Sequence, residues 1–368
     1  MKLLSSDVEE NGEVKRKSQS KKTENPTFSE LPLSLLEVIM SNLVLKDNIR
    51  ASAVCKSWRE AALSVRVSDK APWLMHFPKH SNLCQLYDPL KRKTFELELP
   101  ELADSKVCYS RDGWLLMRIT ASNEMFLFNP FIRERINLPI LEHSYLKIAF
   151  SCTPKSGDTC LVLALKPIGR GVAISTCKLG ASEWITENFP CWPPFESHFH
   201  SNLVYSNGCF YGLYGEGNLF CINPSQRIWY LLTQPSLTKW LFSNKTELSK
   251  KMFLAEHKGV IFGLFMFGDE KPLVYKLESS KWEETNTKHD GLTIFVSMFS
   301  TETRIDLPWI RNNVHFSKVP FDGKRFVYYS FDEQRYYRRN ERSDLDELCP
   351  SRTIWIEAPK KNDDFGLM

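Results

Sequence analysis

The chain has 368 residues with 42% apolar and 25% charged residues, the composition of an ordinary soluble globular protein, and it is long enough for two domains. A formal net charge of +4 is too weak to indicate nucleic-acid binding. The longest apolar run, residues 260–267, is far shorter than a bilayer-crossing segment, and the N-terminus lacks the apolar core of a signal peptide. We therefore expect neither a nucleic-acid nor a membrane partner.

Residues 1–27 are polar and predict a disordered tail. Two basic clusters in it, Lys15–Lys17 and Lys21–Lys22, fit either a nuclear import signal or a chance accumulation of charge. The ten cysteines include no CxxC pair, which indicates reduced thiols rather than a zinc site or a disulfide framework. We expect a location in the cytoplasm, the nucleus or both.

Residues 28–67 are the only stretch dense with helix signals. Pro32 suits the first turn of a helix, and an apolar stripe then recurs at three- and four-residue steps. Asp47 or Asn48 is placed to cap a second helix, and Ser57 a third. The stripe of the first helix is Leu35, Leu36, Ile39 and Leu43. Three short helices bury too little apolar area to be stable alone, so this module is expected to lean on a partner.

The same stretch resembles an F-box. The residues that carry the resemblance are Leu31, Pro32, Leu35, Leu36, Ile39, Leu43, Arg50, Ser52, Val54, Cys55, Trp58 and Arg59. The resemblance implies a three-helix hook that docks on a Skp-type adaptor and, through it, on a cullin. The adaptor contacts carried over from the family are Leu31, Pro32, Leu35, Ile39, Val54, Cys55, Trp58 and Arg59. The alternative is a small helical cap packed on the domain that follows.

After a linker at residues 68–72, residues 73–368 read as short aromatic and β-branched strands bounded by Asn, Asp, Gly and Pro. A turn motif recurs at Asp88-Pro89, Asn129-Pro130 and Asn223-Pro224, with looser copies near Leu179 and Leu277. A final strand set is expected at residues 292–299, 313–316, 326–331 and 354–356. Repeats of about 40 to 50 residues with four strands each are typical of propeller blades. The predicted fold is a small all-α F-box followed by an all-β domain, a six-bladed β-propeller; an irregular pair of β-sandwiches is the alternative.

The β region also resembles the KIB-type propeller of plant F-box proteins. It has neither the Gly-Gly doublet of kelch repeats nor the Trp-Asp dipeptide of WD repeats. The motifs that carry the resemblance, in chain order, are residues 73–75, 112–115, 128–131, 206–211 and 355–356.

A search for catalytic chemistry selects no residue. Gly212, Gly215 and Gly217 lack dinucleotide-binding spacing and instead predict a β-turn. His198 and His200 with Glu196 would form a metal site only with convergent geometry. The segment 191–195 fits a recognition turn or core packing, and the charged segment 332–350 a solvated insertion. We expect no catalytic, cofactor or metal site.

These observations predict the substrate-recognition subunit of a Skp–cullin–F-box ubiquitin ligase, with the F-box on the adaptor and the β domain on an unidentified target protein. Two alternatives remain at this point. One is a scaffold or inhibitor that binds the adaptor without ubiquitination. The other is a propeller enzyme, for which convergent carboxylates or histidines in a central channel would be the sign.

Overall fold

The structure, a computed structural model, describes residues 31–64 with short gaps and residues 71–357 with gaps, the longest at 191–200, 233–249 and 339–351. The chain divides into two compact units, residues 1–66 and 67–368. The predicted tail and its basic clusters lie outside the described residues. We describe each unit by itself.

The described part of the first unit contains two complete helices, α1 (Leu33–Ser41) and α3 (Lys56–Ser64). The Pro32 carbonyl accepts hydrogen bonds from the amides of Leu35 and Leu36, so proline stands just before the helix, where its missing N–H costs nothing. The predicted middle helix lies partly outside the described residues, which place Asp47 and 50–51 in helical conformation. The count of three helices is therefore reduced to two among the residues that the structure describes.

The start of α3 differs from the prediction. The amide of Arg59 donates to the Cys55 carbonyl at 2.9 Å, so the helix begins at Lys56. Ser57 therefore lies inside the first turn and does not cap the helix. A serine near the start of a helix does not by itself identify the first helical residue, because helix ends vary by one or two residues.

A small core joins the two helices. Leu36 and Met40 of α1 pack against Ala61 and Ala62 of α3, and all four are buried. The alanines allow α1 and α3 to approach closely because they have short side chains. Partly buried residues at the margin complete the cluster: Leu31, Leu43, Ala51 and Trp58.

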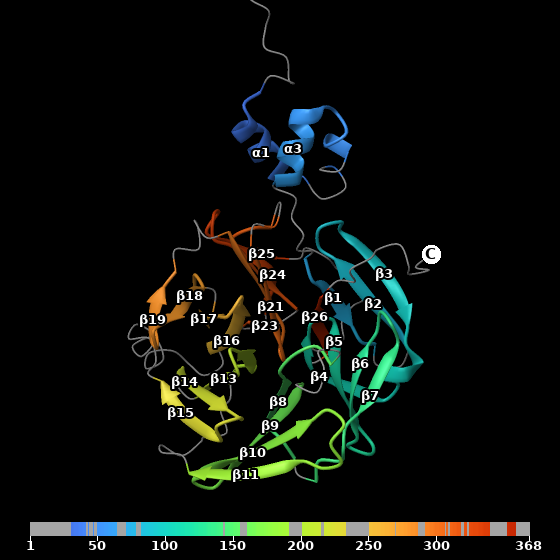
Figure 1. The fold of residues 1–368 in the computed structure, drawn as a ribbon, viewed down its shortest axis with the longest axis vertical. Helices are drawn as coiled ribbons and strands as arrows, with labels where there is room; N and C mark the ends of the chain where they lie inside the picture. Colours follow the sequence, from blue (N-terminus) through green and yellow to red (C-terminus); the bar gives the residue numbers. More distant parts are fainter. Residues whose placement is uncertain are drawn as a thin grey trace, which may run out of the picture. The chain divides into compact units, whose positions relative to one another are not determined.

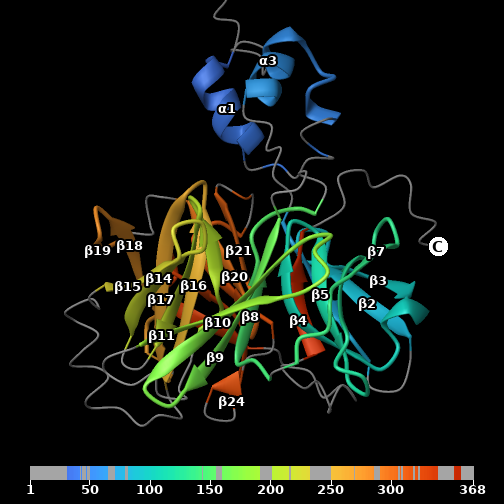
Figure 2. The same cartoon turned by 60° about the horizontal axis from the view of Figure 1, so that its bottom comes forward.

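The second unit consists of six sheets arranged around a common axis (Figures 1 and 2). From the innermost strand outward, the first is β26 (Thr353–Ile356), β1 (Trp73–His76), β2 (Leu83–Asp88) and β3 (Lys93–Glu98). The second is β4 (Ser105–Arg111), β5 (Trp114–Ile119), β6 (Met125–Asn129) and β7 (Glu134–Asn137). The third is β8 (Lys147–Phe150), β9 (Leu161–Ile168), β10 (Gly171–Lys178) and β11 (Ile185–Pro190).

The remaining three sheets follow in chain order. The fourth is β12 (Val204–Ser206), β13 (Cys209–Tyr214), β14 (Asn218–Asn223) and β15 (Ile228–Leu232). The fifth is β16 (Lys250–His257), β17 (Val260–Phe267), β18 (Leu273–Glu278) and β19 (Lys281–Glu284). The sixth is β21 (Thr301–Ile305), β20 (Leu292–Val296), β22 (Asn313–Phe316), β24 (Lys324–Ser330) and β23 (Pro320–Phe321), with β25 (Arg335–Arg338) also paired to β24.

The innermost strands form a closed ring. Each contacts the next, in the order β26, β4, β8, β12, β16, β21 and back to β26. This closure establishes a six-bladed β-propeller, as predicted, and excludes the pair of sandwiches, in which no such ring would exist.

The ring is closed by pairing the end of the chain with the beginning of the propeller. Strand β26 pairs antiparallel with β1, with Trp73 opposite Ile356 and His76 opposite Thr353 (Figure 1). The assignment of 354–356 to the final strand set is therefore wrong, because these residues complete the first blade. Sequence order does not reveal such a pairing, since it joins strands from opposite ends of the propeller.

The sixth blade departs from the simple meander of the others. Its second strand, β20, runs parallel to β22 and antiparallel to the innermost strand β21. Strand β21 was not predicted from the sequence, because its residues, Thr-Glu-Thr-Arg-Ile, are mostly polar. Polar residues occupy this strand because it lies at the axis, where they meet other polar groups.

The repeated Asx-Pro turns are confirmed. They join β2 to β3, β6 to β7 and β14 to β15. Asp88 Oδ1 accepts hydrogen bonds from the amides of residues 90 and 91, and Asn129 Oδ1 does the same for 131 and 132. Each turn ends in an arginine with positive φ: Arg92, Arg133 and Arg227. The side-chain acceptor and the proline together favour the turn, as expected for this motif.

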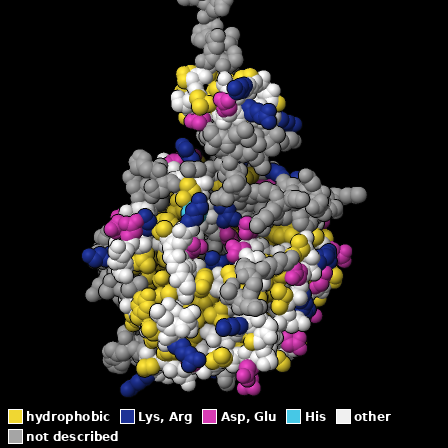
Figure 3. Space-filling view, viewed as in Figure 1, with side chains coloured by type: hydrophobic (Ala, Val, Ile, Leu, Met, Phe, Trp, Pro, Cys, Tyr) yellow, Lys and Arg dark blue, Asp and Glu magenta, His cyan; other side chains and the backbone are white. Residues whose placement is uncertain are grey.

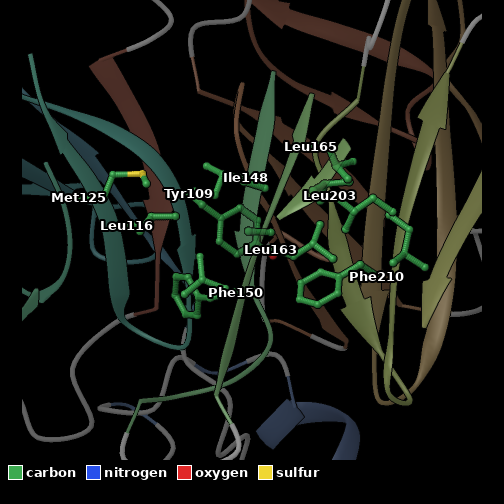
Figure 4. Packing of buried hydrophobic residues seen from close by; sticks show 14 of the residues in the cluster. Tyr109, Leu116, Met125, Ile148, Phe150, Leu163, Leu165, Leu203 and Phe210 are labelled. Carbon is green, nitrogen blue, oxygen red and sulfur yellow. The ribbon is translucent and has the colours of Figure 1, made fainter. Parts of the chain in front are cut away.

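Hydrophobic side chains fill the spaces between blades. Figure 4 shows one such cluster, in which Phe150 packs toward Tyr109 of the second blade on one face of the third blade, and Leu163 lies toward Phe210 of the fourth blade on the other face. Gly212, predicted in a turn, lies instead inside β13. A Cβ atom there would be 2.2 Å from the ring of Phe220, so packing excludes any side chain. Gly217 has a φ of +97° and lies in the predicted turn, whereas Gly215 is outside the described residues.

Candidate functional site

The first unit exposes an apolar surface on the side of α1 opposite its core. Side chains three and four residues apart share one side of a helix, so Leu35, Val38 and Ile39 form one row. Their exposed fractions are 52%, 59% and 38%, and Val54, in the turn before α3, is 65% exposed. We call these four exposed apolar residues the outward face, of which Val54 belongs to the turn before α3 and not to the row on α1. In a unit this small, such a surface is unusual unless a partner covers it.

The predicted adaptor contacts are divided between this face and the unit's core. Leu35, Ile39 and Val54 belong to the outward face, and Pro32 and Arg59 are also exposed. Cys55 is half-buried, while Leu31 and Trp58 are half-buried against the core. The structure therefore makes Leu31 and Trp58 packing residues of this unit, with part of each surface accessible.

Sequence reasoning missed two exposed apolar residues of α1, Leu33 and Val38. The signal for Val38 was present, because it follows Leu35 by three residues on the same side of the helix. The predicted apolar stripe instead contained both Leu35 and Leu36. The structure separates them, since successive helical residues point about 100° apart.

In the second unit, polar residues tie the innermost strands together around the axis. The Ser110 hydroxyl donates to the Trp355 carbonyl at 2.7 Å and lies 2.9 Å from the Ser300 hydroxyl. Asn202 Nδ2 donates to the Leu254 carbonyl at 2.9 Å, and its Oδ1 accepts from the Leu254 amide at 3.1 Å. These buried groups are satisfied by one another, as buried polar groups must be.

Charged side chains meet at one end of the axis. We call Arg111, Asp112, Glu256, Glu302 and Arg304 the axial charge cluster. Arg111 lies 3.4 Å from Asp112 and 3.7 Å from Glu256, and Arg304 lies 3.2 Å from Glu302. Figure 3 shows acidic and basic side chains gathered near the middle of the ring.

Arg111 crosses the axis. It ends β4 in the second blade, yet its Nη1 atom donates to the Tyr205 carbonyl of the fourth blade at 2.9 Å, and Nη2 approaches Glu256 of the fifth. Its guanidinium lies 5.8 Å from the centre of the Tyr205 ring. The turn after Arg111 is tight, with positive φ at Asp112 and Gly113, which places the Asp112 carboxylate beside the guanidinium.

Burial perturbs the ionisable groups of this region. It raises the pKa of the Glu302 carboxyl to about 7, with Arg304 opposing the shift and the carboxylates of Asp112 and Glu357 adding to it. It also raises the pKa of Tyr109 to about 12, against the nearby charge of Arg111. Glu302 keeps only 13% of its side chain exposed, and the loss of hydration disfavours its ionised form.

Several predicted features fall on residues that the structure does not describe: Glu196, His198, His200, segment 191–195, and positions 339–350 of the charged insertion. Across the described part of the chain, no group of three or more His, Cys, Asp or Glu is arranged to hold a metal ion. None of the helices in that part has the length and apolarity to span a membrane.

Comparison with known families identifies both units. Residues 83–328 match the KIB1-4 beta-propeller family, and residues 28–70 match the F-box domain family. The first match covers more than half of the chain. Together, the two matches confirm both resemblances that the sequence motifs suggested.

Related proteins are found in Arabidopsis thaliana. F-box protein At4g00893 is 49% identical over 354 residues, which cover 95% of this chain and 91% of that protein. F-box/kelch-repeat protein At1g57790 is 39% identical over 345 residues, covering 90% of this chain and 95% of that protein. Solved structures are more distant: Hsv2 of Kluyveromyces lactis has 11% identity and a TM-score of 0.33 over 59% of this chain and 60% of its own, too low to bear on function.

Proposed function

Because the chain belongs to the plant F-box proteins that carry a KIB1-4 beta-propeller, we propose that it is the substrate-recognition subunit of a Skp–cullin–F-box ubiquitin ligase. The F-box binds a Skp-type adaptor, and through it a cullin, while the propeller binds the target protein. The chain performs no bond chemistry itself. It raises the local concentration of a target lysine near the ubiquitin-charged enzyme.

The outward face of the F-box is the observation that carries this proposal. Its four apolar side chains are between 38% and 65% exposed, although among the described residues of this unit the buried core consists of Leu36, Met40, Ala61 and Ala62. Covering apolar area contributes about 25 cal/mol per Å². A partner that covers the face stabilises both the complex and the small unit.

The exposure of these side chains indicates which residues contact the adaptor. Leu35, Ile39 and Val54 provide the apolar centre of the interface, with Pro32 and Arg59 at its edge. Leu31, Cys55 and Trp58 contribute their accessible parts and hold the two helices in place. An apolar centre surrounded by a polar rim is the usual arrangement of a protein–protein interface.

The test is co-precipitation of the full chain with a purified Skp-type adaptor, using Leu35→Asp and Ile39→Asp. Each variant places a charge at the centre of the interface, so we expect adaptor binding to weaken by at least about 30-fold, equivalent to about 2 kcal/mol. Ile185→Asp is the matched control, because Ile185 is 57% exposed on β11 of the propeller. Unchanged binding by both F-box variants would refute the assignment of this face.

A second measurement separates a ligase subunit from a scaffold. The chain, adaptor and cullin are reconstituted with ubiquitin and the charging enzymes, and modification of proteins captured by the propeller is followed. A ligase subunit supports transfer that is lost with Leu35→Asp. A complex that forms with cullin yet never transfers ubiquitin to a captured protein would favour the scaffold.

A further inference from the structure

Two cysteines face each other just beyond the paired part of strands β8 and β9. The amide of Ser151 donates to the Leu161 carbonyl at 2.9 Å, which continues the register of these antiparallel strands by one residue. One residue further along, Cys152 and Cys160 are therefore directly opposite each other. Directly opposite residues of antiparallel strands extend from the same face of the sheet. We call these two residues the cysteine pair.

Backbone hydrogen bonds identify the kind of antiparallel position that the cysteine pair occupies. The Cys160 carbonyl accepts from the Leu179 amide, just after β10, at 3.2 Å, so it points away from Cys152. The hydrogen-bonded position is the neighbouring one, where the Leu161 amide also donates to the Ser151 hydroxyl at 2.9 Å. At a position without hydrogen bonds the Cα atoms are about 4.5 Å apart. A disulfide spans about 4.4 to 6.8 Å between Cα atoms, so it can form here with little movement of the backbone.

The two members of the cysteine pair touch, but they differ in access to water. The Cys160 thiol donates to the Cys152 carbonyl at 3.0 Å, and the two thiols also interact with each other. Cys160 is buried, and burial raises the pKa of its thiol to about 12, so it stays protonated at neutral pH. Cys152 is only half-buried. A small oxidant in water therefore reaches Cys152 first.

A second pair of neighbouring cysteines shows why the register matters. Cys209 of β13 and Cys221 of β14 have interacting thiols, and both are buried. Tyr211, and not Cys209, lies opposite Cys221, so the two cysteines are diagonal neighbours. Diagonal positions are about 7 to 8 Å apart, and a disulfide across more than about 7 Å requires the backbone to move. This second pair is an internal negative control.

We propose that the cysteine pair is a redox modification site, in which hydrogen peroxide converts the two thiols into a disulfide between Cys152 and Cys160. The Cys152 thiolate attacks one peroxide oxygen, which gives a sulfenic acid and a hydroxide ion that becomes water by taking up a proton. The Cys160 sulfur then displaces the hydroxyl group from the Cys152 sulfur, and the Cys160 proton leaves with it as a second water. Each sulfur loses one electron, and the peroxide gains both.

The cysteine pair lies beside the axial charge cluster. The hydroxyl of Thr153, which follows Cys152, donates to Asp112 Oδ2 at 3.3 Å. Burial raises the pKa of Tyr205, whose carbonyl binds Arg111, and both sulfurs of the cysteine pair add to that shift. Oxidation would therefore link β8 and β9 covalently next to the end of the axis. A partly exposed disulfide at the short end of the permitted Cα distance is readily reduced again, which suits a reversible modification.

The experiment exposes the full chain to hydrogen peroxide, blocks the remaining thiols and digests the chain with trypsin without reduction. Trypsin cleaves after Lys155, so Cys152 and Cys160 fall in separate peptides, residues 148–155 and 156–170. Mass spectrometry finds these peptides joined only if the disulfide has formed. Dimedone, which traps sulfenic acids, is added to parallel samples.

We expect the joined peptides to appear with peroxide and to disappear with dithiothreitol. They should form about tenfold faster in the folded chain than in urea, because the fold holds the two sulfurs together. Dimedone should label Cys152 in the Cys160→Ser variant and should leave Cys160 unlabelled in the Cys152→Ser variant. The matched control Cys209→Ser should form the joined peptides as the native chain does.

Three results would overturn the inference. One is an equal rate of formation in urea, and another is a preferred link from either member of the cysteine pair to a different cysteine. The third is oxidation of Cys152 to a sulfinic acid with no link to Cys160. All three are measured on the native chain, so they remain decisive even if a serine variant fails to fold.

Discussion

The two units use their apolar residues in opposite ways. The F-box buries four side chains in its core and leaves Leu35, Val38, Ile39 and Val54 exposed. The propeller places large side chains such as Trp114, Phe150 and Phe265 in the spaces between blades, where they are almost completely buried. The first arrangement lowers the stability of the isolated unit and prepares it for a partner. The second gives a self-sufficient domain whose stability depends on closing a ring.

Deletion of the strand that closes the ring should have the largest effect, because the stability of the propeller depends on that closure. A chain that ends at Arg352 lacks β26, whose residues Ile354, Trp355 and Ile356 are almost completely buried. Losing their burial removes about 5 kcal/mol or more, comparable with the whole stability of a domain. We expect calorimetry to show no cooperative unfolding of the propeller. A chain that ends at Glu357 is the control and should keep its transition; equal transitions in both chains would contradict closure by β26.

A buried histidine in the sixth blade gives the propeller an acid sensitivity. His315 stacks between Phe295 and Tyr328, with ring centres 5.1 Å from each, and burial lowers its pKa to about 3. In the unfolded chain a histidine titrates near 6.5. Stability is therefore fully present above about pH 6.5 and is lost as the pH falls toward 3, by roughly 5 kcal/mol at most.

His315→Phe should remove this loss. Phenylalanine continues the stack with its neighbours and does not bind a proton, so the acid midpoint of unfolding, followed by tryptophan fluorescence, should move to lower pH. Near pH 7.5 the variant and the native chain should differ little. An unchanged acid midpoint would show that other groups control acid unfolding.

Leu36 and Leu35 provide the sharpest test inside the F-box because they are neighbours in sequence, yet Leu36 faces the core and Leu35 is exposed. Leu36→Ala removes a buried side chain and should cost about 2 to 4 kcal/mol in the stability of this unit. Leu35→Ala should change stability by less than about 0.5 kcal/mol and weaken adaptor binding instead. Hydrogen exchange of α1 and α3 amides measures the first quantity, and adaptor titration the second. Equal effects on exchange would contradict the assignment of the two sides.

The features that depend on local sequence pattern were predicted, and those that depend on contacts between distant residues were not. The apolar spacing of residues 31–59 predicted a helical module, which resemblance to a known family identified as an F-box, and the Asx-Pro turns predicted hairpins. The same spacing did not show that Leu36 is buried and Leu35 exposed, because an apolar stripe on a helix does not indicate which of its residues face the core. The axial charge cluster was not predicted at all. Arg111, Glu256 and Glu302 are far apart in sequence, and no short motif links them.

By itself, the sequence predicted the order of the two units, a helical module before an all-β domain, and the number of blades. These depend on periodicity and turn chemistry within a few residues of the chain. Only the tertiary structure decided that β26 completes the first blade, that β21 is an innermost strand, and that side chains from several blades form the axial charge cluster. Ring closure brings together residues separated by up to hundreds of positions, and the free energy of that closure comes from packing between blades rather than from any local preference.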